Sequence, residues 1–439
     1  MPWAPDRVPR GSHGGPGRWA GTRWLARVLA LAALVVGGGT CSSGASDESS
    51  PGTSGTPSTA ATTTVPPPTE PRSVREAEQL YAIPDPIPDA PPGTLLRYQR
   101  VERSGLPGSV YRIMYTSTTA AGDPTVVTGT AVVPPGPAPD GGRPVLTHGH
   151  GSTGLADDCA PSRALGRKGS EQLLAELSVL TQQTTPAGYV VASSDYEGQS
   201  GPGRHPFLVG VSEGRSMLDA AVAVGSLPDV ETDGTLSIAG YSQGGHAAVW
   251  ARQLAAERTP DLDVVGTVAG APSTELVDLL RSGAQGSVLG SFPAMVAAGQ
   301  AAGDAELDLD AALTRAGRSM IEAIDDSCAA MSELESSAEP MRVDITTEEP
   351  WHRALLDSTP GQTMGTGPLL IVHSREDRNV PVEQSATLQR RLCARGANVE
   401  RRVLPEGDHV LAAVPTYQQG IAWLAGLDEG ARPASTCPR

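Results

Sequence analysis

Residues 240–244, which read Gly-Tyr-Ser-Gln-Gly, constrain the fold of this 439-residue chain more than any other feature. The short apolar run 236–239 before them is typical of a buried strand, and residues 246–257 after them are rich in good helix formers. A serine on so sharp a strand-to-helix turn is forced close to neighbouring backbone. The flanking positions therefore need glycine, which has no Cβ to clash. The segment predicts a strand, a tight turn that presents Ser242, and a helix.

This arrangement is the nucleophile elbow of enzymes that cleave or transfer acyl groups. The pentapeptide alone is weak evidence, because a chain with 51 glycines can contain it by chance. The alternative is a plain glycine-rich turn that caps a helix. The predicted strand and helix around the turn, together with residues downstream, favour Ser242 as a nucleophile.

An acid and a base follow in the chain order nucleophile, acid, histidine that this kind of site uses. The apolar run 369–372 predicts a buried parallel strand, and Asp377 lies in the loop after its carboxyl end. Glu376 is the rival acid, which loop geometry alone does not exclude. His409 is the one histidine beyond the acid, so it is the candidate base. His409 would take the Ser242 proton, and Asp377 would orient the imidazole.

Two backbone N–H groups are needed to stabilise the oxyanion of acyl transfer. The first is expected from Gln243, the residue after the nucleophile. The second is expected from Ser152, in the loop after the strand-like run 144–147, with Gly151 as the runner-up.

The strands and helices predicted along the chain indicate an α/β-hydrolase fold, with a mostly parallel sheet flanked by helices. Further strands are predicted at residues 95–101, 109–117, 125–133, 189–194, 264–269 and 399–404, and further helices at 171–182, 214–225 and 382–394.

Residues 271 to about 367 interrupt this pattern. Connections of that length are rarely structureless, and the Ala, Leu, Met and Glu content, as in 305–334, predicts several short helices. We interpret the insertion as a cap over the site. A helical insertion that only stabilises the fold is the alternative.

The N-terminal segment predicts export. Residues 1–27 carry five arginines against one acid, and residues 28–36 are entirely apolar, which is typical of a signal peptide over 1–40. Nine apolar residues are too few to span a bilayer. Cys41 directly after the signal is a candidate for lipidation, and residues 41–71, rich in Ser, Thr, Pro and Gly, are expected to form a disordered tether. Residues 72–439 are then the catalytic domain.

With these residues in hand, the chain from about Tyr81 to its C-terminus resembles the secretory lipase family of actinobacteria and fungi, the group that contains the yeast A-type lipases. The segments that carry the resemblance are 151–162, 195–198, 202–206, 212–215 and 240–245. The resemblance implies an α/β-hydrolase core, a helical cap, and hydrolysis of carboxylic esters, including acylglycerols.

The five cysteines leave an odd one, which lipidation of Cys41 would explain. The other four permit three pairings, and free buried thiols are less expected in an oxidising compartment. By resemblance to the family we expect Cys159–Cys328, joining cap to core, and Cys393–Cys437, holding the C-terminal tail.

Few other partners are expected. His148 and His150 could suggest a metal pair, but no third ligand stands at a convincing spacing, so neither a metal nor another cofactor is predicted. The net charge of −16 argues against nucleic acid. The membrane is expected to be reached only through the lipid on Cys41, and the protein to be a monomer.

The leading interpretation is a secreted or surface-anchored serine esterase or lipase that cleaves a lipid or small ester. Acyl transfer from Ser242 to another alcohol is the close alternative. An inactive hydrolase-fold binding protein at the cell surface is a different class, against which the intact Ser242, Asp377 and His409 weigh. A serine peptidase is chemically possible, because such a triad does not choose between ester and amide.

Overall fold

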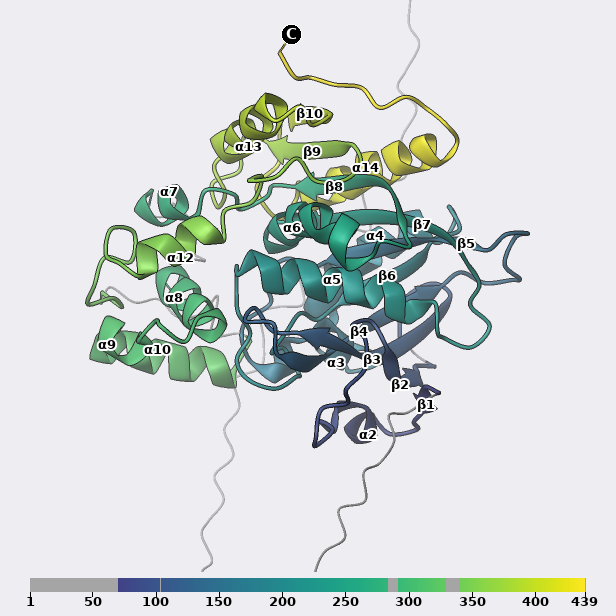
Figure 1. Cartoon of the computed structure of the whole chain (residues 1–439), viewed down its shortest axis with the longest axis horizontal. Helices are drawn as coiled ribbons and strands as arrows, with labels where there is room; N and C mark the ends of the chain where they lie inside the picture. Colours follow the sequence, from purple (N-terminus) through teal and green to yellow (C-terminus); the bar gives the residue numbers. More distant parts are fainter. Residues whose placement is uncertain (1–69, 103, 283–290, 329–338, 439) are drawn as a thin grey trace, which may run out of the picture. The chain divides into compact units, whose positions relative to one another are not determined.

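A ten-stranded sheet runs through the part of the chain that the structure describes (Figure 1). The structure is a computed structural model that describes residues 70–102, 104–282, 291–328 and 339–438. The predicted signal peptide and Cys41, with nearly all of the predicted tether, lie outside the described residues.

The strand order is β1-β2-β3-β4-β6-β5-β7-β8-β9-β10. Strands β2, β3, β4 and β6 pair antiparallel in turn, while β6, β5, β7, β8, β9 and β10 form a continuous parallel half. The bounds are β1 (Arg72–Ser73), β2 (Leu95–Arg100), β3 (Ser109–Thr118), β4 (Pro124–Val133), β5 (Arg143–Gly149), β6 (Val190–Ser194), β7 (Thr232–Tyr241), β8 (Asp263–Gly270), β9 (Leu369–Ser374) and β10 (Val399–Leu404).

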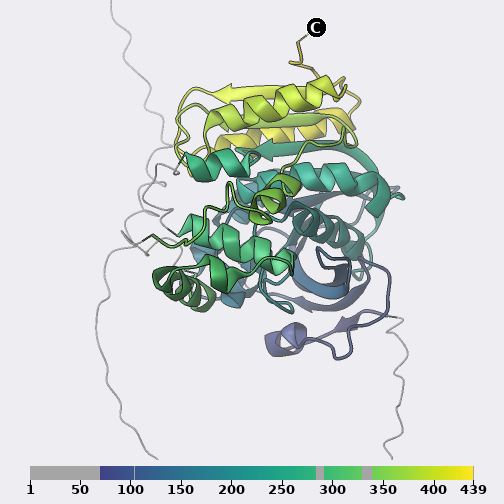
Figure 2. The ribbon, with the colours of Figure 1, turned by 60° about the vertical axis from the view of Figure 1, so that its left-hand side comes forward.

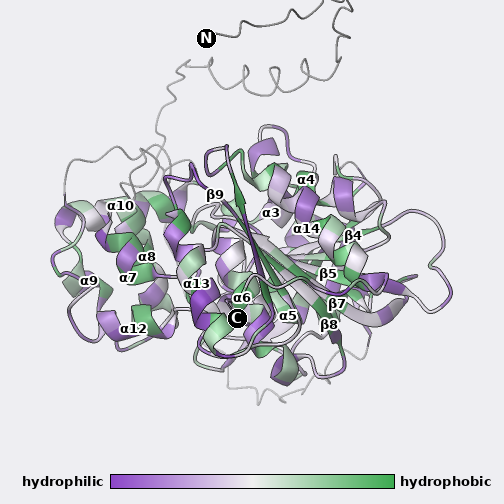
Figure 3. Cartoon of the chain, turned by 90° about the horizontal axis from the view of Figure 1, so that it is seen from above, coloured by the Kyte–Doolittle hydropathy of each residue, from purple (hydrophilic) through white to green (hydrophobic). Residues whose placement is uncertain are grey.

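Helices cover both faces of the sheet, as the view from above shows (Figure 3). One face carries α5 (Gly210–Val224), α6 (Gln243–Arg258) and α13 (Val382–Ala394), and the other carries α3 (Pro161–Ala164), α4 (Ala175–Thr184) and α14 (Ala413–Asp428). Residues of β7 alternate between the two cores. Ile238 packs with the alanines of α6, and Ala239 packs with the α14 side. A short helix, α2 (Ala77–Tyr81), precedes the sheet, and 3₁₀ turns η1 (Asp157–Cys159) and η2 (Glu171–Leu174) flank α3.

The segment between β8 and β9 contains several short helices, which group together beside the sheet (Figure 2). They are α7 (Leu276–Arg281), α8 (Phe292–Gly303), α9 (Leu309–Ala312), α10 (Arg315–Asp326) and α12 (Trp351–Asp357). They have an apolar core of their own, which also takes in Leu155, Phe207 and Leu208 from loops of the sheet unit. Arg204 and Asp325 add a bidentate ion pair between these two parts.

The predicted fold class is confirmed: a mostly parallel sheet with helices on both faces. Strands occur at each predicted position, within a few residues at the ends. Helix α5 begins at Gly210, four residues before the predicted start, because the chain enters it from the buried turn at Leu208, whose N–H is held by Glu213. None of the helices in the described ranges is long and apolar enough to cross a membrane.

Candidate active site

Ser242 lies at the turn between β7 and α6, with a backbone φ of +58°. Such a φ is strained for a residue with a side chain, and packing around the turn must hold it. The Ser242 N–H donates to the carbonyl of Gly270 at 2.9 Å. A Cβ at Gly244 would stand 1.8 Å from the carbonyl oxygen of Gly149, so only glycine fits there. The close approach of α6 to β5 explains the glycines of the motif.

The structure brings Ser242, His409 and Asp377 into one hydrogen-bonded chain. His409 lies in the loop between β10 and α14, and its Nε2 is 2.9 Å from the Ser242 hydroxyl. Its Nδ1 is 2.6 Å from Oδ2 of Asp377, in the loop after β9. The Tyr241 hydroxyl donates to the His409 carbonyl at 2.7 Å and fixes the backbone of that loop. In this geometry His409 Nε2 accepts the serine proton and Nδ1–H donates to the carboxylate.

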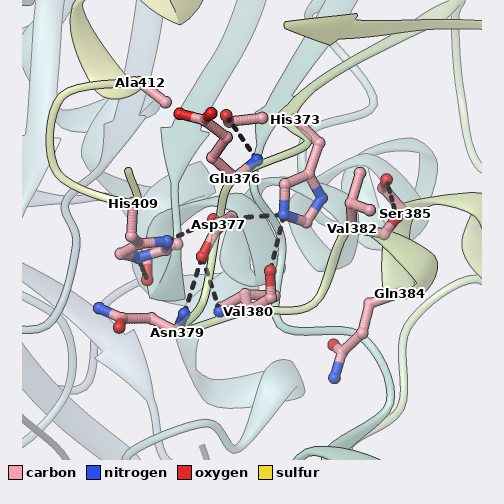
Figure 4. Close-up of polar contacts among 12 residues, drawn as sticks. His373, Glu376, Asp377, Asn379, Val380, Val382, Gln384, Ser385, His409 and Ala412 are labelled. Atoms are coloured by element: carbon pink, nitrogen blue, oxygen red, sulfur yellow. Dashed lines mark hydrogen bonds and ion pairs between the residues drawn. The ribbon is translucent and has the colours of Figure 1, made fainter. Parts of the chain in front are cut away.

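Asp377 is buried, and its two oxygens have different partners (Figure 4). Oδ1 accepts the N–H groups of Asn379 at 3.0 Å and Val380 at 2.9 Å. Oδ2 faces His409 and, at 3.3 Å, the Nε2 of His373. Burial alone would raise the pKa of Asp377, but the hydrogen bonds of His373 and His409 outweigh burial and hold the pKa well below its ordinary value. The carboxylate is therefore ionised at neutral pH.

The rival acid has a different environment. Glu376 is exposed, and Figure 4 draws no contact between its carboxylate and His409. Its Oε2 instead accepts the N–H of Gly407 at 3.1 Å. This contact bridges the acid loop and the loop that carries the histidine.

Two of the oxyanion-hole candidates, Gln243 and Gly151, lie close to the same serine. Gln243 is the first residue of α6, so its N–H has no partner within the helix. The N–H of Gly151, the runner-up for the second donor, is engaged: it donates to Oε2 of Glu176 at 2.8 Å. Burial raises the pKa of Glu176, but the hydrogen bonds of His148, Tyr417 and Gly151 lower it below the ordinary value. Ser152 is the next residue of this loop and remains the predicted second donor.

His148 and His150 do not converge on a common point. His148 Nδ1 is 2.9 Å from the Ser193 hydroxyl, and its Nε2 is 2.9 Å from the Tyr417 hydroxyl. His150 donates from Nδ1 to the carbonyl of Gly151 at 2.7 Å, and its ring lies against Tyr196 with centroids 4.6 Å apart. Among the described residues no group of three or more His, Cys, Asp or Glu is placed to hold a metal ion.

Sequence reasoning missed His373 and, apart from Gln243, a set of polar residues near the site. His373 lies buried near the end of β9, four positions before Asp377, and its Nε2 contacts the Asp377 carboxylate. Glu213, Gln243, His246 and His205 form a hydrogen-bonded cluster beside the elbow. The sequence signal was that His205, Glu213 and Gln243 fall in segments that carry the family resemblance. Neither spacing nor periodicity relates the four residues.

Both disulfides expected from the family resemblance are present. Cys159–Cys328 joins η1 to the segment after α10, and Cys393–Cys437 joins α13 to the C-terminal tail.

Comparison with known proteins agrees with the fold and the motifs. Residues 172–433 match the sequence profile of the secretory lipase family. A protein named "probable inactive lipase" from Mycobacterium tuberculosis is 29% identical over 379 residues, which cover 79% of this chain and 81% of that protein. A secreted triacylglycerol lipase of Malassezia globosa is 26% identical over 380 residues, 81% of each chain.

Among solved structures, Candida antarctica lipase A in its closed state superposes with a TM-score of 0.72 at 21% identity, covering 82% of this chain and 87% of that one. At this identity the likeness supports the fold alone. The profile match extends over more than half of the chain and includes the elbow, the acid loop and the histidine loop. The chain therefore belongs to the secretory lipase family.

Proposed function

We propose that this protein is an extracytoplasmic serine hydrolase that cleaves carboxylic esters of lipids through an acyl-enzyme on Ser242. The observation that carries the proposal is the continuous contact from the Ser242 hydroxyl to His409 at 2.9 Å and from His409 to Asp377 at 2.6 Å. Membership of a lipase family supplies the substrate class, and the relative named a secreted triacylglycerol lipase supports it.

The reaction would begin when His409 Nε2 takes the Ser242 proton and Oγ attacks the ester carbonyl. The N–H groups of Gln243 and Ser152 would stabilise the oxyanion of the tetrahedral intermediate. As the intermediate collapses, the C–O bond breaks and His409 returns its proton to the leaving alcohol. Water, activated by the same imidazole, then releases the fatty acid. Asp377 stabilises the imidazolium in both steps without itself becoming protonated.

Helices α7 to α12 are proposed as the cap. Their apolar core is continuous with Leu155, Phe207 and Leu208, whose loops follow the carboxyl ends of parallel strands. Ligands of open α/β sheets bind at that edge. Apolar helices there suit a fatty acyl chain and would keep water from the acyl-enzyme until hydrolysis.

A second candidate is a binding protein without catalytic activity, which the name "probable inactive lipase" of one relative suggests. Acyl transfer is a third, because an alcohol in place of water would discharge the same acyl-enzyme. The contacts among Ser242, His409 and Asp377 favour a working enzyme over the binding protein, and product analysis separates hydrolysis from transfer.

The decisive experiment compares wild type and Ser242→Ala on p-nitrophenyl esters of increasing chain length. We expect the substitution to lower turnover on the order of 10³-fold or more, because it removes the nucleophile. Ser237→Ala is the matched control and should retain activity, because Ser237 is a buried serine within β7, the strand that leads to Ser242. Full turnover in Ser242→Ala would exclude Ser242 as the nucleophile, and no turnover in wild type would favour the binding protein.

A further inference from the structure

A fully buried polar cluster contacts the first turn of the nucleophile helix. Its members are Glu213 on α5, Gln243 and His246 on α6, and His205 in the loop before α5. The side chains of Glu213 and His246 have no solvent exposure. Gln243 is the residue whose N–H is the proposed oxyanion donor, and His246 N–H donates to the Ser242 carbonyl at 3.0 Å. The cluster therefore contacts the backbone directly after the nucleophile.

Glu213 is surrounded by donors. Its Oε1 accepts the Leu208 N–H at 3.0 Å and the Gln243 Nε2–H at 2.8 Å, and its Oε2 lies 2.7 Å from Nδ1 of His246. The two N–H donors on Oε1 favour an ionised carboxylate, which only accepts hydrogen bonds. A buried carboxylate also needs a countercharge.

His246 is the side chain placed to supply that countercharge. Its Nδ1 faces the Glu213 carboxylate, and its Nε2 lies 2.8 Å from the carbonyl oxygen of Ser358. A carbonyl oxygen has no proton to give, so Nε2 must carry one, and a carboxylate requires a proton on Nδ1 as well. A ring with both nitrogens protonated is an imidazolium.

His205, in the same cluster, has the opposite pattern. Its Nδ1 donates to the Glu197 carbonyl at 2.8 Å, and its Nε2 accepts the other amide proton of Gln243 at 2.8 Å. This ring is neutral, and burial lowers the pKa of His205 to about 4, although the Glu213 charge acts to raise it. The rings of His150 and Tyr196 are the next titratable neighbours: Tyr196 stacks on His205, and His150 contacts Tyr196 at a tilt. The two histidines therefore differ in their contacts: Nε2 of His205 accepts a hydrogen bond, whereas both ring nitrogens of His246 face acceptor oxygens.

We propose that Glu213 and His246 form a buried carboxylate–imidazolium pair that positions the oxyanion amide of Gln243. The pair also anchors the end of the β8–β9 insertion to the nucleophile helix. The positioning role rests on the proposed function; the ion pair does not. Glu213 and His205 between them take both amide protons of the Gln243 side chain, and the bond to the Glu213 carboxylate is charge-assisted. These bonds restrain the Gln243 side chain and so favour a fixed orientation of its backbone.

Ser358, which directly follows α12, provides the contact between His246 and the insertion. Its carbonyl accepts from both His246 Nε2 and Trp250 Nε1, two residues of α6, and its hydroxyl donates to Gln300 of α8 at 3.2 Å. The charge on His246 therefore connects the helix that carries the nucleophile to two helices of the insertion. Loss of this charge would loosen the site and the proposed cap together.

The protonation state can be measured on the unmodified protein. In full-length protein with ¹⁵N-labelled histidine rings, we expect one histidine to keep two protonated nitrogens at pH 8. His246→Gln should remove that signal and so assign it. If His246 of the wild type shows a single protonated nitrogen, the ion pair is wrong. This readout needs no activity, so it stands even if Ser242→Ala shows that the proposed function is wrong.

The positioning role is tested by Glu213→Gln, which keeps the shape and removes the charge. We expect kcat to fall about 10- to 100-fold with KM changed only a few-fold, because the amide acts on the transition state. Glu213→Asp, which keeps the charge, should recover part of the loss. Asp219→Asn is the matched control: Asp219 is a buried carboxylate of α5 that also pairs with α6, through Arg258 at 2.7 Å, far from the elbow turn in sequence.

Asp219→Asn should lower the melting temperature and leave kcat within about twofold, because its pair joins the same two helices without contacting the first turn. Equal kcat losses in Glu213→Gln and Asp219→Asn would mean that the effect is helix packing, which overturns the positioning role. A wild-type kcat in Glu213→Gln would overturn it as well.

Discussion

At the scale of single residues, the site depends on which carboxyl group partners His409. Asp377 lies 2.6 Å from the imidazole, whereas Glu376 bonds to the backbone of Gly407. The two acids are neighbours in the same loop, yet only Asp377 contacts His409. This separation follows from the turn after β9, in which Asp377 Oδ1 accepts the N–H groups two and three residues ahead.

Asp377→Asn should therefore reduce kcat/KM by about 10²- to 10⁴-fold, because an amide holds the imidazole in the wrong tautomer. Glu376→Gln should remain within a few-fold of wild type, since an amide oxygen can still accept the Gly407 N–H. Steady-state kinetics on a soluble p-nitrophenyl ester measure both. Should Glu376→Gln be the damaging change, the acid has been assigned to the wrong residue.

The buried histidines His150 and His205 should make the free energy of unfolding depend on pH. Burial lowers the pKa of both His150 and His205 to about 4, against an ordinary value near 6.5. As pH falls from about 6.5 to about 4, the unfolded chain takes up protons that the folded protein does not, so the free energy of unfolding falls. The loss is complete below the folded pKa and is on the order of 3 kcal/mol per histidine at most.

His205→Gln should reduce the slope of unfolding free energy against pH within that window, because glutamine can donate to Glu197 and accept from Gln243 without titrating. Urea unfolding at several pH values between 4 and 7.5 provides the measurement. Identical slopes for wild type and His205→Gln would show that His205 does not carry this dependence.

The residues differ in how far the sequence could predict them. Ser242 was predictable because its turn needs glycines at fixed neighbouring positions, and Gly244 does meet the Gly149 carbonyl. His409 followed from chain order alone. Glu213 and His246 could not be paired in advance, because they lie on different helices and only the packing of α5 on α6 brings them together. The hydrogen bond from the Gly151 N–H to Glu176 was also not predictable, because only tertiary packing brings α4 next to the loop after β5.

At the scale of secondary structure elements, apolar runs were the reliable signal. The run that became β9 is buried on both faces, and every residue of it is buried. Helix α6 was predictable from composition, although it is nearly all buried where it follows Ser242. The insertion was predictable only as several short helices, because their packing on Leu155, Phe207 and Leu208 is a tertiary property.

The two disulfides constrain these elements differently. Cys159–Cys328 closes a sequence separation of 169 residues and Cys393–Cys437 one of 44. Replacing either pair with serine should cost about 2–5 kcal/mol of unfolding free energy. Loop entropy makes the Cys159–Cys328 pair the costlier one by about 1 kcal/mol.

Denaturant unfolding of the two double-serine variants under oxidising conditions gives the comparison, with the Cys393–Cys437 pair as the internal control. Limited proteolysis should also cut the insertion faster in Cys159→Ser/Cys328→Ser, because the covalent link near the end of α10 would be lost and only non-covalent contacts such as the Arg204–Asp325 ion pair would hold this segment. A larger cost for the tail disulfide would contradict the loop-entropy account.

At the scale of the whole molecule, the predicted signal peptide and tether precede the residues that form the candidate site. A basic segment, nine apolar residues and a cysteine precede a stretch rich in Ser, Thr, Pro and Gly. Two disulfides in the described unit are consistent with an oxidising compartment. If Cys41 carries a lipid, the tether would hold the enzyme near a membrane while leaving the site free to meet substrate.

Cys41→Ser should move the protein from the membrane fraction to the medium, because the thioether that would carry the lipid cannot form on serine. Ser42→Ala, one residue further, is the matched control and should leave the distribution unchanged. Fractionation of cells that express each variant, followed by an ester assay on both fractions, provides the measurement. The specific activity of the released enzyme should equal that of the anchored one, because Cys41 lies outside the unit that contains Ser242, Asp377 and His409. A wild type already confined to the medium, or a Cys41→Ser variant that stays with membranes, would rule out the anchor and leave a freely secreted hydrolase.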